Sequence, residues 1–199
     1  MVLEPLPRSF YARPVLEVAP DLLGKLLVHV TSAGTASGYI TVTEAYMGPE
    51  DKAAHSYGGR KTKRTQAMFG PPGHAYIYLI YGLHYCFNVV TAAVGQPQAV
   101  LVRALKPKDG LGLMLARRKL NQAHLSYPIH HLSNGPGKLC QALGIDKQQY
   151  GWDLTGNKLF IAPGIPVAAE QIDSKPRINI DYADEWAHLP WRFIWNAEC

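Results

Sequence analysis

The amino-acid sequence predicts an α+β fold, in which a mainly antiparallel, curved β-sheet is flanked by helices and carries a protruding β-hairpin. Segments rich in β-branched and aromatic residues outnumber segments with helical periodicity. Most connections between them are too short for the helical crossovers that a parallel sheet needs. With 199 residues and 47% hydrophobic side chains, the chain can bury one sizeable core, so we expect a single domain that spans residues 1–199.

The first half of the chain is predicted to contain short helical segments followed by strands. Pro14 interrupts the helical pattern of residues 9–18 and suits the start of a regular helix. Residues 75–80 and 85–90 are apolar runs around a turn at residues 81–84, a pattern typical of a β-hairpin. The other elements expected in this half are a helical turn at residues 20–24 and strands at residues 25–31, 38–46 and 99–105.

The second half is predicted to contain two helices and several short strands. Residues 109–122 combine apolar side chains with cations near the C-terminal end, where positive charge suits the helix dipole. A helix over residues 138–143 is expected to end at Gly144, because glycine readily adopts the left-handed conformation of a C-terminal cap. Residues 124–133 are expected to form a loop. Short strands are expected at residues 158–161, 166–169, 177–180 and 191–195.

The bulk composition indicates a soluble protein without a membrane segment. No apolar run approaches the roughly 20 residues needed to span a bilayer, and the N-terminus lacks the features of a signal peptide. The three cysteines are far apart and form no CxxC pair, which argues against a disulfide framework. We therefore expect an intracellular location, cytoplasmic or in the nucleoid if the source is bacterial. The net charge of +5 favours a polyanionic partner.

Glu44 is the most unusual residue of the predicted sheet. Strict alternation along residues 38–46 places it on the apolar face with Ile40 and Tyr46, while two threonines occupy the other face. An ionised carboxylate costs on the order of several kcal/mol to bury unless it is paired. A chain that accepts this cost often uses the group in its function. The simpler interpretation is a carboxylate that marks the strand end and points into solvent.

Two further strands each contain a single polar residue in an otherwise apolar run. Asn88 lies in the second strand of the hairpin, and Arg103 lies in the strand at residues 99–105. One such residue is usually a hydrogen-bonded structural group. Together with Glu44 there are three such residues, which suggests that their side chains converge on one site.

A basic segment precedes the hairpin, with four cations in five positions: Arg60, Lys61, Lys63 and Arg64. A charge run is usually a solvated loop. Its position between the Glu44 strand and the aromatic hairpin nevertheless favours contact with phosphate groups.

A glycine-rich turn at residues 135–138 opens the second predicted helix. It lacks the spacing of a nucleotide-triphosphate loop, so that kind of site is excluded. The amides around Gly137, together with Lys138, can still bind a DNA phosphate, although a plain helix start is the simpler interpretation. The histidines at positions 124, 130 and 131 match no strong metal-binding spacing, and we expect no metal site.

Long stretches of the chain resemble the alkyladenine (3-methyladenine) DNA glycosylase family. The resemblance lies in residues 43–56, 68–82 with Asn88, 100–105, 135–143, 185–187 and 190–193. It extends over nearly the whole sequence, and its motifs are long and specific. It implies that the three unusual polar residues belong to one catalytic site.

The resemblance also implies a role for each site residue. Glu44 matches the general base that activates water, and Arg103 matches a residue that helps to hold that water. Asn88 matches a position that disfavours the 2-amino group of guanine. Three further residues match positions that form the walls of the base pocket: Tyr46, His55 and Tyr78. Tyr81, at the hairpin turn, matches the residue that inserts into DNA where the flipped nucleotide was.

These roles imply a monofunctional DNA glycosylase that initiates base excision repair. It would flip alkylated or deaminated purines out of double-stranded DNA and hydrolyse the N-glycosidic bond, as a monomer without a cofactor. The sequence does not rank 3-methyladenine, 7-methylguanine, hypoxanthine and ethenoadenine as substrates. Two alternatives stay open: a non-catalytic binder of damaged DNA, and a helix-hairpin-helix glycosylase with lyase activity, which the turn at residues 135–138 suggests.

Overall fold

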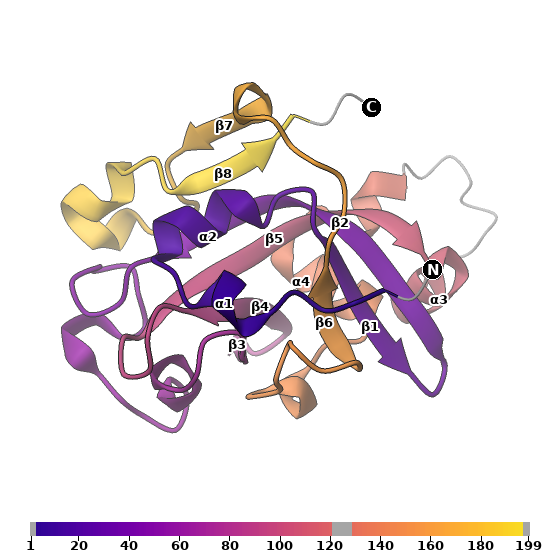
Figure 1. The fold of residues 1–199 in the computed structure, drawn as a ribbon, viewed down its shortest axis with the longest axis horizontal. Coiled ribbons are helices and arrows are strands. Elements are labelled where there is room, and N and C mark those ends of the chain that lie inside the picture. The colour runs from indigo at the N-terminus through magenta and orange to yellow at the C-terminus, as the bar shows by residue number, and fades with distance from the viewer. Residues whose placement is uncertain (1–2, 121–128, 197–199) are drawn as a thin grey trace.

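The structure, a computed structural model, describes residues 3–120 and 129–196, and within these ranges eight strands form one antiparallel sheet (Figure 1). The strands are β1 (Leu26–Thr31), β2 (Gly34–Tyr46), β3 (Ala75–Ile80), β4 (His84–Thr91), β5 (Gln98–Asp109), β6 (Leu159–Ala162), β7 (Ile172–Lys175) and β8 (Arg192–Trp195). The α-helices are α1 (Arg8–Tyr11), α2 (Val15–Asp21), α3 (Leu111–Arg117) and α4 (Pro136–Leu143). The α+β class and the antiparallel sheet are therefore confirmed.

Strand β2 is the centre of the sheet. The strands follow the order β3-β4-β5-β2-β1-β6, and the pair β7–β8 joins β2 beyond β1 (Figure 1). The first half of β2 pairs with β1, its second half pairs with β8, and β5 runs along its other side. Glu44 thus lies between two partner strands, opposite Leu101 of β5 and Arg192 of β8.

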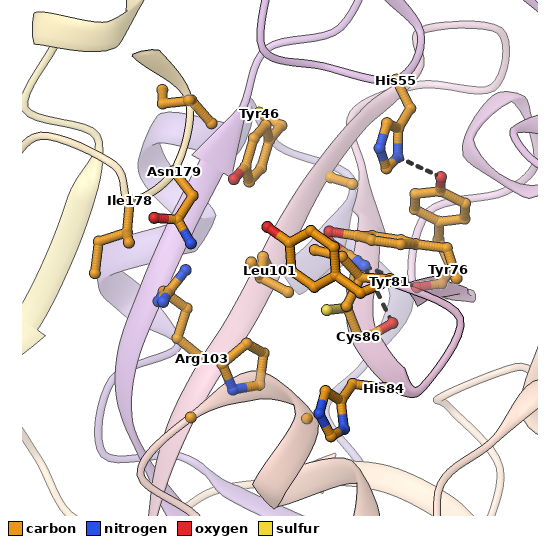
Figure 2. Close-up of a pocket in the computed structure, with 18 of the residues that line it drawn as sticks. Tyr46, His55, Tyr76, Tyr81, His84, Cys86, Leu101, Arg103, Ile178 and Asn179 are labelled. Atoms are coloured by element: carbon orange, nitrogen blue, oxygen red, sulfur yellow. Dashed lines mark hydrogen bonds between the residues drawn. The ribbon is translucent and has the colours of Figure 1, made fainter. Parts of the chain in front are cut away.

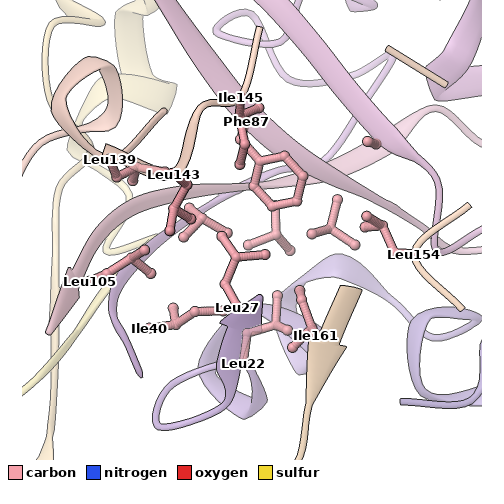
Figure 3. Packing of buried hydrophobic residues seen from close by; sticks show 14 of the residues in the cluster. Leu22, Leu27, Ile40, Phe87, Leu105, Leu139, Leu143, Ile145, Leu154 and Ile161 are labelled. Atoms are coloured by element: carbon pink, nitrogen blue, oxygen red, sulfur yellow. The ribbon is translucent and has the colours of Figure 1, made fainter. Parts of the chain in front are cut away.

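One hydrophobic core joins the helices to the sheet (Figure 3). Leu22, which follows α2, packs in the same cluster as Ile40 of β2, Phe87 of β4 and Leu143 of α4. These side chains are fully buried, and burial of a large aliphatic side chain contributes about 1.5–3 kcal/mol. The core therefore fixes one face of the sheet and leaves the side chains of the opposite face available for a site.

A β-bulge corrects the predicted face of Glu44. The register between β2 and β5 shifts between Ile40 and Thr43, so that both Ile40 and Ala45 belong to the main core although they are an odd number of residues apart. Thr43 is buried as well and donates a hydrogen bond to the backbone carbonyl of Ala19. Glu44 therefore lies on the face opposite Ile40, and the strict alternation that placed the two together was wrong.

Most predicted elements are present, and the differences from prediction lie mainly in the second half of the chain. The hairpin is formed by β3 and β4, and α4 ends at Gly144 with a φ of 70°. The helix predicted over residues 109–122 is shorter, because α3 ends at Arg117; residues 121 and 122 lie outside the described part.

Two of the strands predicted in the last third were wrong. Residues 166–169 are mostly irregular. Directly before them, the backbone N–H of Ile165 donates a hydrogen bond to the carbonyl of Gly24. Residues 177–180 form no strand and instead cover Glu44. Strand β7, at Ile172–Lys175, was not predicted. Its short, half-polar sequence carries little periodic signal.

Candidate active site

A cavity of about 540 Å³ lies on the face of the sheet that the main core leaves free (Figure 2). Its walls come from β2, β3, β4 and β5, from the loop segment at residues 53–68, from the start of α4 and from residues 178–182. The predicted site residues that line it are Tyr46, His55, Arg64, Tyr78, Tyr81, Asn88, Arg103, Gly137 and Lys138. The structure thus brings together residues from five distant parts of the sequence.

Glu44 lies directly behind the wall of this cavity. Its side chain is fully buried, and three donors hold the carboxylate. The hydroxyl of Tyr46 donates a hydrogen bond to Oε2 at 2.8 Å, the backbone N–H of Ile178 donates to Oε1 at 3.0 Å, and a guanidinium nitrogen of Arg103 lies 3.3 Å from Oε1. Tyr46, Arg103 and Ile178, which supply these three donors, all line the cavity.

The Tyr46 hydroxyl remains a donor at any pH near neutrality. Burial and the neighbouring Glu44 carboxylate both raise the pKa of Tyr46 well above its usual value. The protonated phenol therefore keeps its hydrogen bond to Oε2, which fixes the orientation of the carboxylate.

A buried ion pair that the sequence did not reveal anchors the segment covering Glu44. Arg177 is paired with Asp51, and both side chains are inaccessible to solvent. The Arg177 guanidinium also donates to the backbone carbonyls of Ala45 and Trp186 and lies 4.8 Å from the centre of the Tyr46 ring. Since Ile178 follows directly, this arrangement positions the N–H that binds Glu44. No local pattern could have paired residues 126 positions apart.

Three aromatic rings form the deep wall of the cavity. The His55 ring packs edge-on against Tyr78, with ring centres 4.6 Å apart, and its Nδ1 lies 2.8 Å from the hydroxyl of Tyr76. Burial, assisted by the charge of Arg64, lowers the pKa of His55 to about 4, so the imidazole is neutral at neutral pH. Burial raises the pKa values of Tyr76 and Tyr78. The wall therefore offers neutral aromatic surfaces, and Tyr76 is a member that the sequence did not identify.

Asn88 of β4 lines the cavity as well. Its side-chain amide donates to the carbonyl of Tyr76 at 3.0 Å and, more weakly, to that of Cys86 at 3.5 Å. These bonds tie the amide to the two strands of the hairpin and hold it at a defined position in the wall.

Tyr81 lies at the tip of the hairpin, as predicted. It is 76% exposed and adopts a positive φ of 52°, a conformation that costs a non-glycine residue about 1–2 kcal/mol. Leu83, two residues further, is 77% exposed. The tip therefore presents two large side chains to solvent, with the Tyr81 ring at the rim of the cavity (Figure 2).

The basic residues divide into two groups. All four are exposed, but Arg64 lines the cavity, whereas Arg60, Lys61 and Lys63 do not. The Lys61 ammonium lies 5.4 Å from the centre of the Phe69 ring.

The start of α4 packs closely against β4. A Cβ atom at Gly137 would lie 2.9 Å from the His84 Cβ, so this glycine lets the helix approach β4. The Lys138 ammonium donates to the side-chain oxygen of Asn134, and both residues line the rim of the cavity.

Three further observations concern metal ligands, membrane-spanning helices and the helix-hairpin-helix motif. No group of three or more His, Cys, Asp or Glu side chains within residues 3–120 and 129–196 is placed to hold a metal ion; His124 lies outside these ranges. None of the described helices is long and apolar enough to cross a membrane. A single 3₁₀ turn, Ile129–Leu132, precedes the turn at residues 135–138 in the described part, so a first α-helix of a helix-hairpin-helix motif is not seen there.

Comparisons with known proteins identify the family of this chain. The family model described as methylpurine-DNA glycosylase (MPG) matches residues 9–199. Similar proteins come from Bacillus cytotoxicus (52% identical over 194 residues), Bacillus cereus strain B4264 (51% over 197) and Bacillus anthracis strain CDC 684 (53% over 197). Each alignment covers 96% of this chain and 95% of the relative, and each relative carries the name "Putative 3-methyladenine DNA glycosylase". On both grounds, the chain belongs to the methylpurine-DNA glycosylase family.

Proposed function

We propose that this chain is a monofunctional DNA glycosylase, which acts as a single-domain monomer on double-stranded DNA that contains alkylated or deaminated purines. The observation that carries the proposal is the buried Glu44 carboxylate, held by three donors behind an aromatic-lined cavity with an exposed tyrosine at its rim. A base inside a duplex hides its glycosidic bond, so the nucleotide must leave the stack, at a cost of roughly a few kcal/mol.

The cavity and the hairpin tip suit this step. Tyr81 fills the space that the flipped base leaves, and stacking on a neighbouring base contributes about 1–3 kcal/mol. The rings of His55, Tyr76 and Tyr78 receive the flipped purine. Aromatic rings taken alone also attract a positively charged alkylpurine through cation–π interaction.

Hydrolysis then needs one activated water. Glu44 takes its proton as the water attacks the sugar, and Arg103 helps to hold that water in place. A damaged purine is a good leaving group, so one carboxylate suffices where most O-glycosidases use two. Among the described residues, the lysine that lines the cavity is Lys138, and its ammonium is bonded to Asn134. This supports hydrolysis without a lysine adduct and without strand cleavage.

Release of free bases from a panel of lesion duplexes tests the proposal. The panel holds 3-methyladenine, 7-methylguanine, hypoxanthine and ethenoadenine, each with an undamaged duplex as control. Release of at least one lesion base with an intact abasic strand is expected. Tight binding without release would instead favour the non-catalytic binder of damaged DNA. Borohydride trapping of a covalent protein–DNA adduct would favour the lyase alternative.

Replacing Tyr81 by serine is expected to weaken lesion binding and excision with little effect on thermal stability. Tyr81 is exposed, and surface substitutions usually change stability by about 0.5 kcal/mol or less. Excision kinetics and thermal melting check this prediction. Val94→Ser removes another exposed apolar side chain, 68% accessible and outside the cavity, and is the matched control. Unfolding of Tyr81→Ser with normal residual specific activity would instead identify Tyr81 as a stability residue.

Binding to DNA is expected to weaken steeply with salt, because the exposed cations of the basic segment should contact phosphates. Each phosphate contact adds roughly −0.9 to the slope of log K against log salt. Replacing Arg60 and Lys63 together by alanine should flatten that slope by up to about two such increments. Lys147 and Lys158 are exposed and lie outside the cavity, and their double alanine variant is the control. An unchanged slope for the first pair would show that this segment is merely solvated.

A further inference from the structure

We propose that Arg64 sets the charge class of the purine that the cavity accepts, by favouring neutral purines over cationic ones. The inference rests on the proposed function, because it names the substrate class of the same cavity. It starts from the position of Arg64: of the four cations of the basic segment, all of which the structure describes, Arg64 lines the cavity.

The guanidinium of Arg64 is placed against two of the three rings of the pocket wall. A terminal nitrogen lies 3.1 Å from Nε2 of His55, and the guanidinium carbon lies 5.0 Å from the centre of the Tyr78 ring. The backbone behind it is fixed as well, because the Tyr150 hydroxyl donates to the carbonyl of Arg64 at 3.1 Å. Arg64 is therefore held as part of the wall, at its solvent end.

These contacts determine how protons are arranged along the wall. An arginine is a donor only, so Nε2 of His55 must accept. The neutral imidazole then carries its proton on Nδ1 and donates it to the Tyr76 hydroxyl. This agrees with the pKa of His55, which burial and Arg64 lower to about 4. Arg64 therefore places a positive charge at this end of the cavity, whereas Arg103, which also lines the cavity, is paired with the buried Glu44 carboxylate.

A positive charge in this position changes what the pocket prefers. Bare aromatic rings would attract a cationic alkylpurine, but here Arg64 already makes the cation–π contact with Tyr78. A second cation a few ångströms away is repelled, less strongly than in a closed site because Arg64 is exposed and solvent screens its charge. A neutral purine meets no such repulsion, and its ring nitrogens or carbonyl oxygen can accept hydrogen bonds from the guanidinium.

The test compares the excision of one neutral and one cationic base by matched variants. Hypoxanthine and 7-methylguanine are placed in the same duplex, and their release is measured in single turnovers with saturating enzyme, so that DNA affinity does not contribute. Arg64→Gln is expected to raise the ratio of 7-methylguanine to hypoxanthine release by roughly tenfold, the scale of a partly screened repulsion. Arg64→Lys keeps the charge and should keep the ratio near that of the wild type.

Arg60→Gln is the matched control, because it removes one positive charge from the same segment at a residue outside the cavity. It should leave the ratio unchanged. An equal change in both rates for Arg64→Gln, or the same ratio in Arg64→Gln and Arg60→Gln, would overturn the role of Arg64. Failure of the wild type to release any base of the four-lesion panel would contradict the proposed function itself, whereas release of cationic bases alone would overturn the preference for neutral purines. Thermal melting establishes whether each variant is folded. If Arg64→Gln does not fold, Arg64→Lys still tests the role of the charge.

Discussion

Glu44→Gln is expected to bind lesion-containing DNA about as well as the wild type and to lose about 10²–10⁴-fold in the rate of base release. Glutamine has nearly the same shape as glutamate and can still accept a hydrogen bond from the N–H of Ile178. It cannot take a proton from water, and it leaves Arg103 without its counter-charge. Single-turnover excision and a separate binding titration distinguish loss of chemistry from loss of affinity.

Glu50→Gln is the control for this prediction, because Glu50 is an exposed carboxylate close to the end of the same strand. Tyr46→Phe adds a second comparison, since it removes one donor to the carboxylate and leaves the carboxylate in place. We expect a smaller loss for Tyr46→Phe than for Glu44→Gln. Excision by Glu44→Gln within about threefold of the wild-type rate would exclude Glu44 as the general base.

The elements that could be predicted from the sequence are those with strong local signals. The hairpin was found because Tyr81 and Gly82 separate two apolar runs, and both residues indeed adopt positive φ. The end of α4 was found because Gly144 suits a left-handed cap. Such signals depend on a few neighbouring residues, so they survive without any knowledge of the tertiary structure.

The site residues were found for a different reason. Glu44, Asn88 and Arg103 are polar residues in apolar strands, and the cost of burying them marks them as unusual. The face of Glu44 was nevertheless wrong, because the bulge between Ile40 and Thr43 depends on the pairing with β5 and leaves no local pattern. The burial of the Glu44 carboxylate agrees with the structure, whereas the face of the strand on which it was predicted does not.

The residues that hold Glu44 in place could not be predicted. Ile178 contributes a backbone N–H, and a backbone group carries no signal in its side chain. Residues 177–180 were expected to form a strand, and instead Arg177 binds Asp51 and two backbone carbonyls at the edge of the cavity. The contacts of Arg177 with Asp51 and Ala45 join segments more than 100 residues apart, and they exist only once the sheet has formed.

Arg177→Ala is expected to lower the free energy of unfolding by about 3–5 kcal/mol, because it leaves the Asp51 carboxylate buried without its counter-charge. Both side chains of the pair are inaccessible to solvent. The control is Arg13→Ala, which breaks the surface pair with Asp21 and should cost about 1 kcal/mol or less. Urea unfolding followed by tryptophan fluorescence measures both variants.

The same substitution also tests how Glu44 is positioned. Arg177 precedes Ile178 and stacks on the Tyr46 ring, so its loss should disturb two of the three donors to the carboxylate. Folded Arg177→Ala, assayed well below its melting temperature, should therefore release bases more slowly than Arg13→Ala at equal DNA occupancy. The double variant Asp51→Ala/Arg177→Ala removes the unpaired charge and should recover part of the stability, because the penalty lies in the orphaned carboxylate. If it regained full activity as well, Arg177 would act through stability alone, and the segment at residues 177–180 would not need this anchor to present its N–H to Glu44.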